Sequence, residues 1–180
     1  SIRSRHMNAP VNGLHAESTS LSTEQTIQFA NKDFIIGTKV TETLFFMNLN
    51  RENKGNKLSV SFMDSIMNHI DYYEANQTLK SVILRSFDQK TFSQGTDFKS
   101  LEFAIAQGDK AEVVRQLDKL QEFAEHVAAT NLVMLTNLNG VLSNSAASIF
   151  TQLPFVYDAG NTRLVFNEVD MQSPLLGGVS

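Results

Sequence analysis

Apolar and polar positions follow two different periods along this chain, and the two periods alternate. Residues 33–50 alternate apolar with polar side chains and are rich in β-branched and aromatic types, which predicts two short strands joined by a turn near Gly37-Thr38. In residues 58–74, apolar side chains recur at every third or fourth position, which predicts a helix with one buried face. That face consists of Leu58, Phe62, Ile66, Ile70 and Tyr73.

The second half of the chain repeats this alternation of strand and helix patterns. Residues 80–86 and 131–138 are short apolar runs typical of buried strands. Between them, residues 111–130 follow the breaker Gly108 and have helical spacing. The predicted buried face of this second helix is Val113, Val114, Leu117, Leu120, Phe123 and Val127. The order strand, helix, strand, helix, strand favours an α/β fold with a largely parallel sheet.

Two loops in this arrangement are candidates for a functional site. Ligands of parallel α/β folds bind where loops leave the carboxyl ends of the strands. The loops that do so here are residues 87–101 and residues 137–148, the second of which leads into another short helix. Both loops are rich in small polar residues, so backbone N–H groups there can serve a ligand.

Composition narrows the range of functions. The 180 residues are 42% hydrophobic and include 13 phenylalanines, enough for one globular domain with a core. The chain has no cysteine for a disulfide or a thiolate metal site, and its four histidines lie too far apart for metal-ligand spacing. A formal charge of −4 gives no general attraction to nucleic acid. All apolar runs are too short to span a bilayer, so we expect a soluble protein.

The first 25 residues differ in composition from the rest of the chain. Residues 1–25 are rich in Ser and Thr, and Arg3 and Arg5 lie near the start. A basic, Ser-rich leader is typical of an organellar transit-peptide remnant, whereas His6-Met7 resembles a cloning scar, and both readings stay open. We therefore expect a flexible leader over residues 1–30 and a single domain over residues 31–180. The expected location is mitochondrial, with the cytoplasm and the peroxisome as alternatives.

Three stretches carry short motifs in a fixed order. Residues 49–66 contain Leu-Asn-Arg, then Asn-x-Leu and the first helix; residues 92–101 read "FSQGTDFKSL"; residues 137–168 contain Asn-Gly, a loop, a helix and a final Asn-Glu. In this order and at this spacing, the motifs resemble those of the crotonase superfamily, the enoyl-CoA hydratases and isomerases. The resemblance runs from about Asp33 to Ser180.

The resemblance implies a crotonase-like β-β-α superhelix (the ClpP/crotonase fold), here lacking the family's C-terminal helical region. It also implies acyl-CoA as the ligand, and no metal or separate cofactor. The family polarises the thioester carbonyl with two backbone amides, which by matching position are those of Thr96 and Ser145. The residues of the matching acyl-CoA loop are Phe92, Gln94, Gly95 and Asp97. Independently of the resemblance, Asp97 and Lys99 suit the start of a helix and its surface.

Departures from the family pattern fall in the second loop. Asn144, Ser145 and Ala146 stand where the family has three glycines, and their β-carbons narrow the site. Asn tolerates a left-handed backbone angle, so Asn144 is expected to adopt one, whereas the two residues after it lack that tolerance. Of the family's two catalytic glutamates, the first matches Ser148 and is lost, and the second matches Glu168.

Three readings of function follow from the resemblance and its departures. The first is a pseudoenzyme: an enoyl-CoA hydratase/isomerase-like protein with a degenerate active site, acting as a structural or interaction subunit of a mitochondrial assembly. The alternative is an active enoyl-CoA isomerase that uses Glu168 as its base and the amides of Thr96 and Ser145 as oxyanion donors. The third is acyl-CoA binding without turnover. Protein partners or a homo-oligomer are expected, because a missing C-terminal region leaves apolar surface to be covered.

Overall fold

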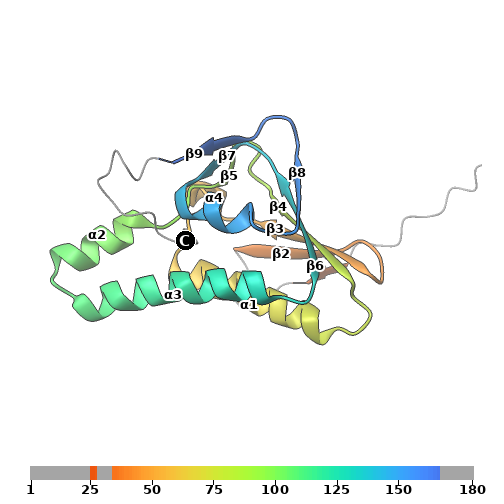
Figure 1. Ribbon diagram of the computed structural model, residues 1–180, viewed down its shortest axis with the longest axis horizontal. Helices are drawn as coiled ribbons and strands as arrows, with labels where there is room; N and C mark the ends of the chain where they lie inside the picture. Colours follow the sequence, from red (N-terminus) through yellow and green to blue (C-terminus); the bar gives the residue numbers. More distant parts are fainter. Residues whose placement is uncertain (1–24, 28–33, 167–180) are drawn as a thin grey trace, which may run out of the picture.

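The computed structural model describes Gln25–Ile27 and residues 34–166 (Figure 1). These residues form two sheets. The larger sheet has the strand order β1 (Gln25–Ile27), β2 (Ile35–Lys39), β3 (Leu44–Leu49), β4 (Ser81–Ser86), β6 (Val133–Leu138), β8 (Phe155–Asp158). The smaller sheet has the order β5 (Thr91–Ser93), β7 (Val141–Ser143), β9 (Arg163–Val165). From β3 to β8 all strand pairs are parallel, as predicted, whereas β1, β2 and β3 are antiparallel.

Helices connect the parallel strands. They are η1 (Glu52–Lys54), α1 (Val60–Ala75), α2 (Phe98–Ala106), α3 (Lys110–Ala129) and α4 (Asn144–Phe150). In Figure 1, α1 and α3 lie side by side along the larger sheet, and α4 lies next to the smaller one. No helix in the described part of the chain is both long and apolar enough to cross a membrane.

The two long predicted helices and the two buried strands after them are confirmed within about two residues, but the short helix expected after residue 148 already begins at Asn144, and the predicted turn is wrong. Gly37 and Thr38 lie inside β2, where they pair with Met47 and Phe46 of β3. The chain reverses after Lys39, and the amide of Val40 donates to the carbonyl of Leu44. The prediction failed because the sequence does not distinguish a glycine within a strand from a glycine in a turn. In addition, β1 lies inside the range predicted to be a leader.

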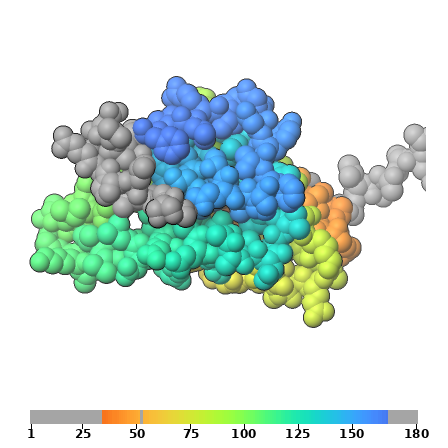
Figure 2. Space-filling model, viewed as in Figure 1, coloured from red at the N-terminus to blue at the C-terminus, as the bar shows by residue number. Residues whose placement is uncertain are grey.

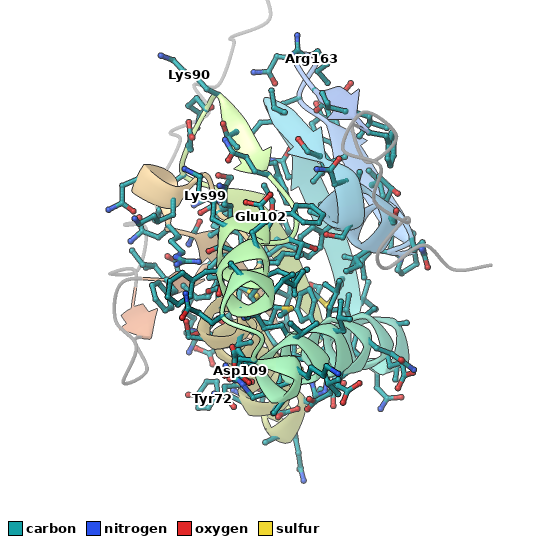
Figure 3. All side chains as sticks on the ribbon, turned by 90° about the vertical axis from the view of Figure 1, so that its left-hand side faces the viewer. Tyr72, Lys90, Lys99, Glu102, Asp109 and Arg163 are labelled. Atoms are coloured by element: carbon teal, nitrogen blue, oxygen red, sulfur yellow. The ribbon has the colours of Figure 1, made fainter. Side chains whose placement is uncertain are left out.

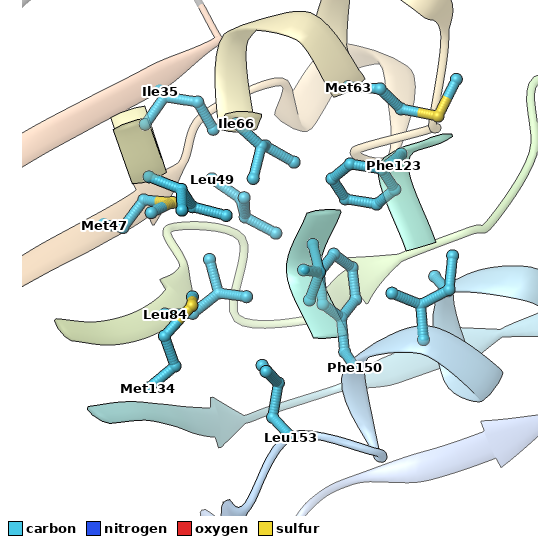
Figure 4. Packing of buried hydrophobic residues seen from close by; sticks show 14 of the residues in the cluster. Ile35, Met47, Leu49, Met63, Ile66, Leu84, Phe123, Met134, Phe150 and Leu153 are labelled. Carbon is cyan, nitrogen blue, oxygen red and sulfur yellow. The ribbon is translucent and has the colours of Figure 1, made fainter. Parts of the chain in front are cut away.

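The core lies between the larger sheet and the helices α1 and α3 (Figure 4). Every second side chain of β3 and β4 points into it, and all five residues of the predicted face of α1 are buried. The corresponding face of α3 is buried only in its second half, at Leu120, Phe123 and Val127. Val114 is 54% exposed, contrary to prediction, because the first half of α3 extends past the sheet and packs with α2 as a projecting lobe (Figure 2).

Three phenylalanines connect the smaller sheet with the helices α3 and α4. Phe150 of α4 packs edge-on against Phe92 of β5 and Phe123 of α3, with ring centroids 5.6 and 6.1 Å apart. All three rings are fully buried. Aromatic pairs of this kind add to the free energy of burial, so this cluster fixes α4 and the smaller sheet against the main core.

Burial of His69 makes the stability of α1 depend on pH. The side chain is 2% exposed, and its Nδ1 lies 2.8 Å from the carbonyl oxygen of Ser65. Burial lowers the pKa of His69 below its usual 6.5, and the hydrogen bond with Ser65 opposes this only in part. The folded protein therefore holds this imidazole neutral at a pH where an exposed imidazole would take a proton.

We predict that the free energy of unfolding falls as the pH drops below about 6.5, since the unfolded state then binds a proton that the folded state does not. His69→Gln should remove this part of the slope, as measured by urea unfolding between about pH 7.5 and 5.5. The control is His126→Gln on α3, a partly exposed histidine whose Nε2 lies 3.0 Å from Asp71. An unchanged slope in His69→Gln would contradict the prediction.

Candidate functional site

The two predicted loops meet at one end of the smaller sheet. β5 and β7 are parallel neighbours, so the residues after Ser93 and after Ser143 leave the sheet side by side. The sequence placed both loops directly after the buried strands β4 and β6, whereas the structure inserts these three-residue strands first. The site is therefore built at the carboxyl ends of strands, as expected, but on the second sheet.

Thr96 and Ser145 touch across the gap between the loops. The backbone amide of Thr96 donates a hydrogen bond of 3.0 Å to the Ser145 hydroxyl, and the two side-chain hydroxyls lie 2.8 Å apart. Ser145 is only 1% exposed. The acceptor on the Thr96 amide is thus a side chain of this same chain, which the sequence did not reveal.

Gly95 allows this close approach. Its φ is +76°, and a β-carbon built on it would lie 2.8 Å from the Ser143 carbonyl oxygen and 3.2 Å from the Ser145 hydroxyl. An L-residue would therefore meet both a strained backbone angle and a steric clash. The first loop keeps its glycine where the contact between loops requires one.

Asn144 has the left-handed angle that the sequence predicted, with φ of +54°. The strain expected of the next two residues is absent, because Ser145 and Ala146 belong to the right-handed helix α4. The side chains of all three are buried. The backbone of this loop is therefore right-handed helix from Ser145 onward, and the three side chains fill the space around it.

Asn56 holds the first loop in place. It is fully buried with φ of +46°, and its Nδ2 donates to the Ser86 hydroxyl and to the Phe92 carbonyl, each at 2.9 Å. Its Oδ1 accepts from the Arg51 amide at 2.7 Å, and its carbonyl accepts from the Ser93 hydroxyl, also at 2.7 Å. This residue is the Asn of the Asn-x-Leu motif, which the sequence identified without indicating these contacts.

The residues on either side of Asn56 bind the segment that contains Thr96. Gly55 accepts a hydrogen bond from the Gln94 amide, and Leu58 donates to the Gly95 carbonyl at 2.8 Å. Leu58 and Thr96 form an isolated parallel bridge. The Thr96 amide is thereby held in a fixed direction by hydrogen bonds between backbones.

The other predicted site residues are spread over different environments. Phe92 belongs to the aromatic cluster in the core, and Gln94 is exposed. Asp97 is the N-terminal cap residue of α2, where its side chain makes no capping hydrogen bond. Lys99 lies on the surface of α2, as expected (Figure 3). Glu168 lies outside the described residues, so its role stays a prediction.

A polar hollow of about 320 Å³ lies beside the first loop, between the starts of α1 and α3 and Ser100 of α2. Its charges are paired: Arg115 binds Glu112 at 2.7 Å, and Lys119 binds Asp64 at 3.0 Å. Hydrogen bonds from Arg115 and then Gln116 lower the pKa of Glu112 to about 2. The hollow therefore offers hydroxyl groups and compensated charges. Within the described ranges, no three His, Asp or Glu residues are grouped so as to hold a metal ion.

Comparison with known proteins identifies the family. Residues 44–143, more than half of the chain, match the enoyl-CoA hydratase/isomerase family. The chain belongs to this family. A comparison with curated protein sequences found no match.

Solved structures of this family share the fold. An enoyl-CoA hydratase from Geobacillus kaustophilus superposes with a TM-score of 0.72 at 19% identity, over 83% of this chain and 54% of that one. The enoyl-CoA hydratase of Bacillus anthracis gives 0.71 at 20% identity, over 80% and 54%. Pseudomonas aeruginosa DspI gives 0.72 at 14%, over 83% and 59%. These likenesses confirm the crotonase fold, and this family member spans little more than half the length of the three structures.

We predict that Asn56→Ala lowers the free energy of unfolding by about 3 kcal/mol or more, because several buried groups lose their partners together. Asn56→Gly should restore only about 1 kcal/mol of this loss, since glycine relieves the left-handed angle but makes no side-chain hydrogen bond. Urea unfolding measures both variants. Equal stability of Asn56→Gly and the wild type would show that the backbone angle, and not the amide, is what matters.

Two loop glycines give a second prediction. Both Gly140 and Gly160 have positive φ, but a β-carbon on Gly140 would overlap the backbone carbonyl of Lys90, whereas one on Gly160 would meet no atom within 4 Å. Gly160→Ala should cost about 1 kcal/mol of stability for its backbone angle alone. Gly140→Ala should cost about 2 kcal/mol more, because β5 must move away from β7. Equal costs by chemical unfolding would contradict this.

Proposed function

We propose that this family member is not a catalyst and acts as a structural or interaction subunit of a larger assembly. The observation that carries the proposal is the hydrogen bond from the Thr96 amide to the Ser145 hydroxyl. By the resemblance to crotonases, this amide is where a thioester carbonyl would bind. Its hydrogen bond is already made within the chain.

The energetics support this proposal. A free oxyanion donor contributes roughly 3 kcal/mol to catalysis because it meets charge that develops in the transition state. Here a substrate carbonyl would first have to displace the Ser145 hydroxyl, which is buried and would lose both of its contacts with Thr96. Leaving a buried hydroxyl without a partner costs about 1–3 kcal/mol. The stabilisation that the Thr96 amide could give to a transition state is therefore largely offset by the cost of displacing the Ser145 hydroxyl.

The loss of a carboxylate supports it further. Ser148, at the position of the family's first catalytic glutamate, is a partly exposed residue of α4. A serine hydroxyl has no charge with which to activate water at neutral pH. Hydration by a pair of glutamates is therefore disfavoured, and Glu168 alone remains as a candidate base.

The surface supports an interaction role. Within residues 34–166, β8 and β9 are the outer strands of their sheets, and five large apolar side chains on them and just after are at least 44% exposed. They are Phe155, Val156, Tyr157, Leu164 and Phe166. Apolar side chains gathered at free strand edges favour binding to another protein surface, whether a partner or a second copy. The composition of residues 1–25 is the basis for proposing a mitochondrial location.

A second candidate function is an enoyl-CoA isomerase with Glu168 as its single base and acyl-CoA as its ligand. One observation favours it: the Thr96 amide still points at an acceptor oxygen, so the direction of this donor is kept. Acyl-CoA binding without turnover would need the same donor.

We predict that the full chain does not convert a 3-enoyl-CoA to its 2-enoyl isomer, and that Glu168→Gln leaves this result unchanged. The assay follows the absorbance of the conjugated product. Glu125→Gln, at an exposed position of α3, is the matched control. Turnover that disappears in Glu168→Gln but persists in Glu125→Gln, with unchanged circular dichroism, would establish the isomerase instead. A strictly monomeric chain that copurifies with no partner would contradict the subunit role.

A further inference from the structure

Among the three residues at the family's glycine positions in the second loop, Ser145 is distinguished by its contact with the first loop. Asn144 follows the left-handed backbone path that a glycine would take. Ala146 is fully buried and packs in the hydrophobic core. Of the three, Ser145 alone makes a hydrogen bond to the Thr96 amide, across 49 positions of the sequence.

The Ser145 hydroxyl makes two contacts with Thr96, one with its backbone amide and one with its side-chain hydroxyl. A hydroxyl has one donor and two acceptor sites. The Thr96 amide donates to it, and the second contact joins it to the Thr96 hydroxyl, with either group able to donate. The nearest atoms to a β-carbon on Gly95 also include the Ser145 oxygen, so the first loop closes tightly over it.

We propose that the Ser145 hydroxyl is an internal ligand that occupies the position of an acyl carbonyl oxygen, and that this one side chain closes the site to acyl thioesters. The inference rests on the proposed function, which takes the Thr96 amide as the place where an acyl group would bind. It goes further, because it assigns the closure to one removable oxygen atom.

Removal of the hydroxyl should therefore open an acceptor site. In Ser145→Ala the Thr96 amide keeps its direction, because Leu58 and Gly95 hold the loop from the other side. A carbonyl oxygen can then take the place of the missing hydroxyl. Ser145→Gly also removes the β-carbon and leaves more room for the thioester.

The test compares binding of butyryl-CoA with that of free CoA by calorimetry, using the full chain. The wild type should bind the two with similar affinity or bind neither. Ser145→Ala and Ser145→Gly should bind butyryl-CoA about tenfold more tightly than free CoA, as expected for one recovered hydrogen bond. Ser81→Ala, at the start of β4 and outside both loops, is the matched control and should behave as the wild type.

A second measurement keeps the inference testable if the variants bind no CoA at all. In Ser145→Ala the amide of Thr96 should exchange with deuterium about tenfold faster than in the wild type, because it has lost its acceptor. The amide of Leu58, bound to Gly95, should be unchanged and reports that the loop is intact. Unchanged exchange at Thr96, or an equal preference for butyryl-CoA in the wild type, would overturn the inference.

These outcomes are separate from those that test the proposed function. Turnover by the wild type that depends on Glu168 would refute the non-catalytic role, whatever Ser145 does. A non-catalytic wild type whose Ser145 variants gain no preference for butyryl-CoA would refute the internal ligand alone.

Discussion

The buried side-chain amide of Asn56 is the constraint on which the site depends. It joins the segment before α1 to the end of β4 and to β5 through hydrogen bonds of 2.7–2.9 Å. Aspartate lacks the two donors, glutamine is longer, and alanine tolerates the left-handed angle poorly, so few residues could replace it. Because Gly55 and Leu58, on either side, bind the first loop, this one amide also sets the direction of the Thr96 N–H.

The hydrogen bonds of Asn56 do not include Ser148, the residue that by resemblance matches the family's first catalytic glutamate. The ring contacts of Phe150 with Phe92 and Phe123 do not include it either. These parts of the fold therefore do not depend on a glutamate at position 148. A buried N–H without an acceptor destabilises a protein by about 1–3 kcal/mol. The Ser145 hydroxyl supplies such an acceptor to the Thr96 amide, as the proposed non-catalytic role requires.

Much of the fold was predictable from sequence, because helices and strands place apolar residues at different periods. The errors have physical causes. Periodicity does not show where a helix extends beyond its sheet, and for this reason the exposure of Val114 was not predicted. A glycine within a strand, such as Gly37, cannot be distinguished by sequence from a glycine in a turn. In the site, the angle of Asn144 followed from a local property of asparagine. The direction of the Ser145 hydroxyl did not, because it depends on a loop 49 residues away.

One physical requirement, that polar groups and apolar surfaces both need partners, applies to the contact between Thr96 and Ser145 and to the exposed edge of the molecule. Asp158 at the end of β8 accepts hydrogen bonds from the amides of Gly160 and Thr162, so the turn between the two edge strands satisfies its own polar groups. The apolar side chains of β8 and β9 differ from these polar groups, since among the described residues both strands are outermost in their sheets and five large apolar side chains, Phe166 included, stay at least 44% exposed. An unsatisfied amide can be met by one hydroxyl from within the chain, but an apolar strand edge needs a surface as large as itself. A partner surface of that size is what the proposed role as a subunit would supply.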